Sequence, residues 1–427
     1  MNLNVRPSGN LHGRIVLPAN KSHSFRALVM AALARGVSHI HRPNTSADWL
    51  RGTEALEMLG ATVSPEAGDS WVIHGTEGKI ATPDDVLDCG NSGIIFRFFA
   101  GLAATGAGYT VLTGDESIRR IRPAGPLLEA LSQLGAFAVS TKGDGHAPVV
   151  IRGPLRGGRA KLSGADSQPV SALLIACALA DAPTELTVTE PGEKPWITLT
   201  LDWLGRCGVE VSNQDFTTYR VRGRQQWDGF DATIPLDWSA AMYPIAAALI
   251  TEGSEVHLPG LDPADSQPDR QTIEVLRQMG ADIEIGDEGV TARSSTLTGC
   301  EIDCNDFIDQ FPLLAVVGCC ADGETVLTNA EICRHKECDR ISEIARALTA
   351  MGADLEERQD GLVVRRSVLH GAVLNSRADH RMVMTLATAG LVASGETIIS
   401  DVKCVRKTFP HFVQEMEKIG AVVMTER

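Results

Sequence analysis

The stretch LRQMGADIEI, residues 276–285, joins the end of a helix-like pattern to the start of an alternating, strand-like pattern through a single glycine. The same arrangement occurs six times along the chain. Its members are LEMLGATV (56–63), LSQLGAFAV (131–139), LGRCGVEV (204–211), LRQMGADIEI (276–285), LTAMGADLEE (348–357) and MEKIGAVV (416–423). Successive glycines of this series lie 75, 73, 72, 72 and 68 residues apart, and such even spacing indicates a fold built from internal repeats.

A second series has the same period and consists of alanine-rich apolar segments, each followed by an alternating strand. Its members are ALVMAALARG (27–36), FRFFAGLAATG (96–106), VSALLIACALADAP (170–183), AAMYPIAAALITEG (240–253), FPLLAVVGCCADG (311–323) and RMVMTLATAGLVASG (381–395). Segments that are apolar on nearly all sides predict buried helices. The helices that lead into the glycines carry charge on one face and predict outer helices. Each repeat is therefore predicted to be a βαβαββ unit with one buried and one exposed helix.

Six such units exceed one hydrophobic core, because single cores stop growing at about 250 to 300 residues. We therefore expect an α/β fold of two domains with three repeats in each. Residues 15–232 would form the first domain, and residues 1–14 together with 233–427 the second. The boundary falls where RGRQQWDGFDATIPLDW (222–238) interrupts the pattern. A cleft is expected between the two domains.

The chain is acidic, with a net charge of −15 from 39 Lys and Arg against 54 Asp and Glu. This balance argues against a nucleic-acid-binding protein, which usually presents a basic face.

No signal or transit peptide is readable, and no apolar stretch reaches the roughly 18 residues of a membrane span, so we expect a cytoplasmic protein without membrane contacts. The cysteine spacing does not fit a structural zinc site, and we expect no metal.

The unusual polar residues gather in two loops of each repeat, one ahead of the buried helix and one ahead of the outer helix. Helix N-termini present N–H groups and a positive dipole end, so such loops can bind an anion even in an acidic protein. The cations in these loops are Lys21, Arg26, Arg97, Arg122, Lys336, Arg340, Arg381 and Lys407. Any one of them could be a solvated surface charge. Their recurrence at equivalent positions instead favours a site for small ligands with several negative charges.

Two carboxylates, Asp309 and Glu337, lie among these cations. A carboxylate beside Arg or Lys keeps its charge and can act as a base, whereas burial favours the protonated form, which can act as an acid. Either could instead be a helix-start carboxylate, and this is the interpretation we favour for Asp339 and Asp379. Gly93 fits either the close approach of a ligand to the backbone or a capping turn at a helix start.

At these loops the sequence resembles the enolpyruvyl transferase family. The resemblance runs from about Leu17 to Phe412. It rests on the ordered motifs LPANKSHSFRAL (17–28), LDCGNSGIIFR (87–97), LTGDESIRRIRP (112–123), SGADSQPVSALL (163–174), EKPWITLTLDWL (193–204), FIDQFPLLAV (307–316), RHKECDR (334–340), ADHRM (378–382) and KCVRKTFPHF (403–412). It implies a two-domain inside-out α/β barrel. It also implies transfer of the enolpyruvyl group of phosphoenolpyruvate to the 5-hydroxyl of shikimate 3-phosphate, with release of phosphate and without a metal or cofactor.

Carried over by motif, the resemblance implies two sets of binding residues. Phosphoenolpyruvate would be surrounded by Lys21, Gly93, Arg122, Gln168, Glu337, Arg340, Arg381 and Lys407. Shikimate 3-phosphate would be held by Lys21, Ser22, Arg26, Ser167, Gln168, Asp309 and Lys336. Among these, Asp309 would take the proton of the 5-hydroxyl as its oxygen attacks C2, and Lys21 or Glu337 would protonate the methylene carbon. The resulting tetrahedral intermediate would then lose phosphate.

Four positions depart from the commonest pattern of this family. Asp166 and Glu193 stand where serines near the acceptor's phosphate are usual, Ile94 replaces a threonine, and Ile332 replaces an asparagine. Carboxylates would repel that phosphate. Either the two acids turn outward and pair with Arg or Lys, or the acceptor lacks this phosphate.

Three alternatives remain open at this point. The sister enzyme that acts on UDP-N-acetylglucosamine has a catalytic Cys in the loop equivalent to 114–123 and an Asn after its opening lysine, whereas this chain has no Cys there and Ser22 after Lys21. A second alternative is transfer to another cyclic alcohol. A third is a binding protein without activity, against which Lys21, Asp309 and Glu337 speak. We expect a monomer whose partners are two small anionic substrates.

Overall fold

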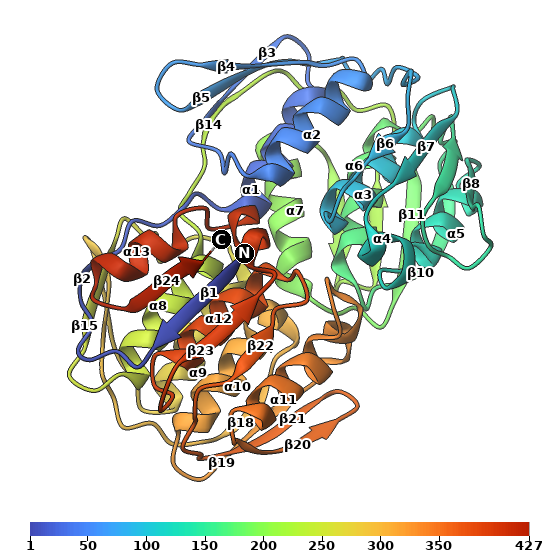
Figure 1. Ribbon diagram of the computed structural model, residues 1–427. Helices are drawn as coiled ribbons and strands as arrows, with labels where there is room; N and C mark the ends of the chain where they lie inside the picture. Colours follow the sequence, from blue (N-terminus) through green and yellow to red (C-terminus); the bar gives the residue numbers. More distant parts are fainter. Residues whose placement is uncertain (427) are drawn as a thin grey trace. The chain divides into compact units, whose positions relative to one another are not determined.

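The computed structural model describes residues 1–426, and the chain divides into two compact units. One unit consists of residues 21–234, and the other of residues 1–20 with those from 235 onward. Each unit contains three four-stranded sheets, and each sheet belongs to one repeat of helices and strands (Figure 1). The six βαβαββ repeats that the sequence predicts, three in each unit, are confirmed.

The unit 21–234 begins with a helix and ends with the strand that completes its first sheet. Its strands are β3 (Val37–His41), β4 (Thr62–Glu66), β5 (Ser70–His74), β6 (Leu87–Asp88), β7 (Thr110–Thr113), β8 (Phe137–Ser140), β9 (Val149–Arg152), β10 (Gly158–Ser163), β11 (Thr184–Thr189), β12 (Val211–Gln214), β13 (Thr218–Val221) and β14 (Asp231–Thr233). Its helices are α1 (Lys21–Leu33), α2 (Ala47–Met58), α3 (Gly93–Ala103), α4 (Glu116–Arg120), α5 (Gly125–Gln133), α6 (Ser167–Leu179) and α7 (Lys194–Arg206). The sheet orders are β14-β3-β5-β4, β6-β7-β9-β8 and β10-β11-β13-β12. In each sheet the first pair is parallel and the other two pairs are antiparallel.

The other unit takes two of its strands from the beginning of the chain. Its strands are β1 (Asn2–Arg6), β2 (His12–Arg14), β15 (Glu255–Pro259), β16 (Asp282–Gly286), β17 (Gly289–Arg293), β18 (Glu301–Asp303), β19 (Glu324–Thr328), β20 (Asp354–Arg358), β21 (Gly361–Arg365), β22 (Val373–Asn375), β23 (Thr397–Ser400) and β24 (Val422–Glu426). Its α-helices are α8 (Trp238–Ile250), α9 (Thr272–Gln278), α10 (Phe311–Cys320), α11 (Arg340–Ala350), α12 (His380–Gly390) and α13 (Phe412–Lys418). Short 3₁₀ helices precede four of these: η1 (Pro268–Gln271), η2 (Asn305–Gln310), η3 (Glu331–His335) and η4 (Val402–Lys407). The blue strand β1 lies between the red strands β23 and β24 in Figure 1, and β2 pairs in parallel with β15.

The glycine of each repeated motif ends an outer helix. The φ angles are 104, 92, 72, 101, 89 and 98° at Gly60, Gly135, Gly208, Gly280, Gly352 and Gly420. This left-handed conformation costs little for glycine, and it is the usual way to close a helix before the chain turns into a strand. The even spacing read from the sequence is therefore the spacing of six equivalent helix ends.

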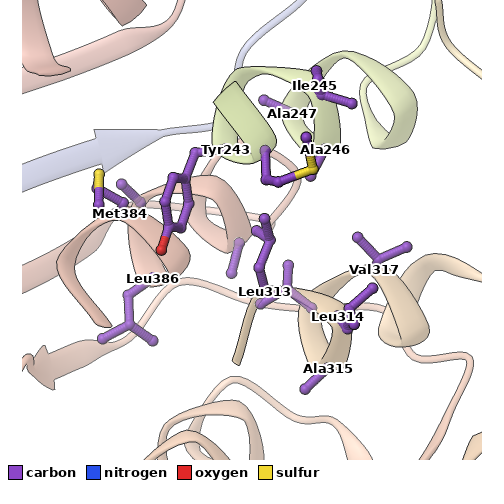
Figure 2. Packing of buried hydrophobic residues seen from close by; sticks show 14 of the residues in the cluster. Tyr243, Ile245, Ala246, Ala247, Leu313, Leu314, Ala315, Val317, Met384 and Leu386 are labelled. Atoms are coloured by element: carbon purple, nitrogen blue, oxygen red, sulfur yellow. The ribbon is translucent and has the colours of Figure 1, made fainter. Parts of the chain in front are cut away.

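The apolar helices of the repeats, α1, α3, α6, α8, α10 and α12, form the interior of the two units, and we call them the inner helices. Nearly every residue of each inner helix is buried. Figure 2 shows Tyr243 and Ala246 of α8, Leu313 of α10, and Met384 and Leu386 of α12 close together in one such core. None of the helices in residues 1–426 is long and apolar enough to cross a membrane.

Candidate active site

Most of the predicted site residues of the unit 21–234 lie at the beginnings of its inner helices, whereas Arg26 lies further along α1 and Arg122 lies between α4 and α5. Lys21 and Ser22 begin α1, Gly93 begins α3, and Ser167 and Gln168 begin α6. The structure brings several of them together, because a Cβ atom placed on Gly93 would lie 2.6 Å from Nη1 of Arg122, 2.9 Å from Nη1 of Arg97 and 3.1 Å from Oε1 of Gln168. The close approach expected at this glycine is therefore made by the polar ends of three side chains.

Lys21 is connected to the beginning of α3 through Asp48. Its Nζ lies 3.9 Å from Oδ2 of Asp48, and the same oxygen accepts a hydrogen bond of 2.9 Å from Oγ of Ser92. Asp48 lies in the first turn of α2, in one of the loops that the sequence singled out. Its part in holding Lys21 was missed, because the sequence alone does not show which lysine an acidic helix start will meet.

Arg26 is a buried cation whose hydrogen-bond partners are neutral. Only 2% of it is exposed. Its guanidinium donates to Oγ1 of Thr200 (2.8 Å), to the backbone oxygen of Trp196 (3.2 Å) and to that of Ser22 (3.2 Å). Burial lowers the pKa of Arg26 to about 9. Within residues 1–426 no carboxylate contacts this guanidinium, and it can receive an anionic group of a ligand.

The two unexpected carboxylates at α6 behave differently from each other. Asp166 caps the helix by accepting from the backbone N of Gln168 (3.0 Å), and its Oδ2 lies 3.0 Å from Nη2 of Arg97. Glu193 is 2% exposed and does not turn outward, contrary to the first of our two expectations. Its Oε2 accepts from both the backbone N (2.8 Å) and Oγ (2.9 Å) of Ser167.

In the other unit, Asp309 lies between two buried arginines. Its Oδ1 accepts from Nη1 of Arg340 at 2.7 Å, and its Oδ2 accepts from Nη2 of Arg381 at 2.6 Å. Burial alone would raise the pKa of Asp309, but the charges of Arg381, Arg340 and Lys336 outweigh this effect. The pKa therefore lies well below its ordinary value. Asp309 is a carboxylate without a proton and can accept one.

Arg340 connects the acidic residues of this unit. It is 1% exposed, and its guanidinium contacts Asp309, Oε2 of Glu337 (3.0 Å) and Oδ2 of Asp379 (2.7 Å). Burial on its own lowers an arginine pKa, but the three carboxylates, Asp379 first, raise the pKa of Arg340 well above its usual value. Arg340 therefore stays charged and fixes three carboxylates at once.

Glu337 accepts hydrogen bonds from two cations. Besides Arg340, its Oε1 receives Nζ of Lys407 at 2.9 Å, and Nδ1 of His380 lies 3.9 Å from the same oxygen. Lys336, the preceding residue, is half-buried. The predicted residues of this unit, Asp309, Lys336, Glu337, Arg340, Arg381 and Lys407, thus belong to one connected group of charges.

Asp339 and Asp379 both cap helices, as we favoured from the sequence. Asp339 accepts from the backbone N of Ser342 at 3.0 Å, and Asp379 accepts from the backbone N of Arg381 at 2.8 Å. The structure adds the contact of Asp379 with Arg340, which the capping interpretation did not foresee. Asp379 therefore has two roles, as a helix cap and as a partner of the charged group.

One further acid, Asp269, was not singled out from the sequence. It is fully buried, and its Oδ2 accepts from Oγ of Ser239 and from Nε2 of Gln310 (3.0 Å). Its Oδ1 has no hydrogen-bond partner among residues 1–426. Burial raises the pKa of Asp269 to about 7, although the charge of Arg381 opposes the shift. Gln310 directly follows Asp309. The hydrogen bond between Gln310 and Asp269 therefore helps to hold the segment that carries Asp309.

Comparisons with known proteins show the family to which the chain belongs. Residues 5–416 match the family described as EPSP synthase (3-phosphoshikimate 1-carboxyvinyltransferase). The chain is 42% identical over 425 residues to the 3-phosphoshikimate 1-carboxyvinyltransferase of Acetivibrio thermocellus, with 100% of both chains covered. It is 43% identical over 432 residues to that of Halobacterium salinarum, with 99% of both covered.

Solved structures give the same result for the fold. An EPSP synthase from Acinetobacter baumannii superimposes with a TM-score of 0.84 at 29% identity, over 100% of both chains. The enolpyruvyl transferase NikO from Streptomyces tendae superimposes with a TM-score of 0.76 over 99% of this chain and 98% of NikO, and at 19% identity it supports the fold alone. The fold is the two-domain inside-out α/β barrel. With its six repeats and its charged helix starts, the chain belongs to the EPSP synthase (3-phosphoshikimate 1-carboxyvinyltransferase) family.

Proposed function

We propose that this protein transfers the enolpyruvyl group of phosphoenolpyruvate to the 5-hydroxyl of shikimate 3-phosphate and releases phosphate. The observation that carries the proposal is the position of Asp309 between Arg340 and Arg381, in a chain of this family. Asp309 is a carboxylate that can accept a proton, and the two arginines beside it are cations that can bind an anionic substrate.

The first step joins the two substrates. The 5-hydroxyl oxygen forms a bond to C2 of phosphoenolpyruvate, and its proton passes to Asp309. The electrons of the carbon–carbon double bond take up a proton at the methylene carbon, giving a tetrahedral intermediate. Both carboxylate oxygens of Glu337 accept hydrogen bonds from cations, Oε2 from Arg340 and Oε1 from Lys407, whereas the ammonium group of Lys21 is a proton donor. We therefore assign the delivery of this proton to Lys21.

The second step releases phosphate. A proton leaves the new methyl group, its electrons re-form the double bond, and the phosphate departs with the electron pair of the C2–O bond. Glu337, whose two oxygens act as hydrogen-bond acceptors, is suited to take up this proton. The negative charge that moves onto phosphate needs preorganised cations. Arg340, Arg381 and Lys407, which belong to one connected group of charges, supply them in this proposal.

Asp309 becomes a stronger base when phosphoenolpyruvate binds. In the structure both arginines donate to its carboxylate, and their charges hold its pKa low. A base is most effective when its pKa lies near the working pH. Carboxylate and phosphate groups of the substrate compete for Arg340 and Arg381, so binding weakens their hold on Asp309. The donor substrate thus prepares the base that activates the acceptor.

Phosphate release tests the proposal. The protein is incubated with phosphoenolpyruvate and, in parallel, with shikimate 3-phosphate, shikimate or UDP-N-acetylglucosamine. Release with shikimate 3-phosphate alone is the expected result. Release only with shikimate contradicts the assignment of the phosphorylated acceptor, release only with UDP-N-acetylglucosamine shows the sister activity, and release with none shows a binding protein.

We further propose that the protein is a cytoplasmic monomer with these two substrates as partners. Light scattering after gel filtration measures its mass and so tests whether it is a monomer.

A further inference from the structure

The beginning of α6 holds a carboxylate of the chain itself. Oε2 of Glu193 accepts from the backbone N and from Oγ of Ser167, the first residue of the helix. Glu193 comes from a different segment, directly ahead of α7. Two donors at a helix start, together with the helix dipole, form a typical place for an anion. In this structure Glu193 provides that anion.

Ser167 is also one of the residues that hold the acceptor's phosphate in the proposed function, on which this inference rests. Its backbone N–H and its hydroxyl are the groups that such a phosphate would use. Both now donate to Glu193. A phosphate and the carboxylate cannot share these donors without placing two negative charges in contact. The substrate and Glu193 therefore compete for Ser167.

Arg26 provides a second observation, because its hydrogen-bond partners are neutral while Glu193 is bound to Ser167. Its guanidinium donates to Trp196 and Thr200 of α7, and Oγ1 of Thr200 in turn donates to Oγ of Ser171 at 2.8 Å. Ser171 lies one helical turn beyond Ser167. A buried cation with neutral partners thus lies beside the first turns of α6 and α7. An anionic acceptor would gain Arg26 and take Ser167 from Glu193.

The other carboxylate of this helix start does not compete in the same way. Asp166 accepts from the backbone N of Gln168, not from Ser167, and it is paired with the buried cation Arg97. Its charge is neutralised where it stands. Glu193 is the acid that occupies the donors of Ser167.

We propose that Glu193 is a specificity-determining residue that occupies the phosphate position at α6 in the ligand-free protein and must leave Ser167 before a phosphorylated acceptor binds. The affinity for such an acceptor is reduced by the fraction of molecules in which Glu193 lies on Ser167. An acceptor without this phosphate leaves the contact intact. Glu193 therefore weakens the preference for shikimate 3-phosphate over shikimate.

The test compares Glu193→Gln with Glu190→Gln. The first variant keeps an oxygen that can accept from Ser167 but removes the charge. The second changes an exposed carboxylate of the same loop, whose contact is Oγ of Ser163 at 3.4 Å. For Glu193→Gln we expect the KM for shikimate 3-phosphate to fall about tenfold, with the KM for phosphoenolpyruvate changed less than about twofold. Glu190→Gln should match the wild type. An unchanged or higher KM for shikimate 3-phosphate in Glu193→Gln overturns the proposal.

A binding measurement separates this inference from the proposed function. Calorimetric titration with inorganic phosphate needs no turnover, so it is informative even if the wild type transfers no enolpyruvyl group. Tighter phosphate binding by Glu193→Gln than by the wild type supports the competition, and equal or weaker binding overturns it. Glu193→Ala provides a second variant, because its short side chain does not reach Ser167, and the same tightening is expected. A thermal melt of each variant confirms that it is folded.

Discussion

Asp309 and Arg340 are joined by a hydrogen bond of 2.7 Å, and the same arginine reaches Glu337 and Asp379. The proposed base is therefore not an isolated acid but one of three carboxylates held by a single buried cation. Three carboxylates and one arginine can therefore coexist in the buried part of the unit, because each of these charges contacts an opposite charge. This arrangement also means that the acidity of Asp309 depends on what else binds Arg340.

Replacing Asp309 with Ala should lower kcat by about a hundredfold or more, because a positioned base is lost. The KM for phosphoenolpyruvate should not rise, since Arg340 and Arg381 lose a competing carboxylate. Steady-state kinetics in both substrates measure the two effects. Asp287→Ala, at an exposed position between β16 and β17 of the same unit, is the matched control. A kcat within tenfold of the wild type would remove Asp309 from the role of base.

Gly93→Ala should raise the KM for phosphoenolpyruvate about tenfold, the cost of about one weakened charge-assisted hydrogen bond. The reason is that the added Cβ would lie 2.6 Å from Nη1 of Arg122 and force this cation to move. Gly125→Ala is a close control, because Gly125 also begins a helix and a Cβ there meets nothing within 4 Å. Equal KM values for the two variants would show that the position of Arg122 beside Gly93 does not matter for the binding of phosphoenolpyruvate.

The repeat could be predicted because it follows from backbone requirements. Each motif glycine ends a helix in a left-handed conformation. Because this conformation favours glycine, the same residue recurs at six equivalent positions of the sequence. The fold and the charged loops follow from such patterns. Most of the candidate site residues were found in the same way, because their loops recur at the same point of each repeat.

Burial of single acids could not be predicted. Glu193 and Asp269 both lie in loops whose composition is typical of an exposed turn. No local sequence pattern predicts that Glu193 contacts Ser167 or that Asp269 contacts Ser239. These contacts join residues 26 and 30 positions apart in the sequence, which only the folded chain brings together. The sequence therefore indicated which loops gather charged side chains but not which acid each donor would meet.

Arg26→Gln should separate stability from binding. Burial lowers the pKa of Arg26 to about 9, which shows that the folded protein disfavours this charge. The variant's melting temperature at pH 7 should therefore equal or exceed that of the wild type. The KM for shikimate 3-phosphate should rise about tenfold or more, because a charge-assisted contact is lost. Arg35→Gln, which removes an exposed ion pair with Asp228, should change neither quantity. A less stable Arg26→Gln with an unchanged KM would contradict both statements.

Asp269→Asn should change how stability depends on pH. The pKa of Asp269 is raised from 3.8 to about 7 in the folded protein. Between these values the folded state holds a proton that the unfolded chain releases, so the free energy of unfolding falls as the pH rises through this window. The amide oxygen of Asn can still accept from Ser239 and Gln310, but Asn carries no charge.

Thermal melts from pH 4 to pH 8 measure this effect. We expect the Asp269→Asn variant to melt above the wild type at pH 8, with the difference shrinking toward pH 4, where both side chains are largely neutral. Asp287→Asn, at an exposed position, should follow the wild-type curve throughout. If Asp269→Asn melts below the wild type at pH 8 and not at pH 4, the pKa of Asp269 is not raised, and its charge stabilises the folded state through Arg381. In that case the charged group of this unit contains one more ion pair than its hydrogen bonds reveal.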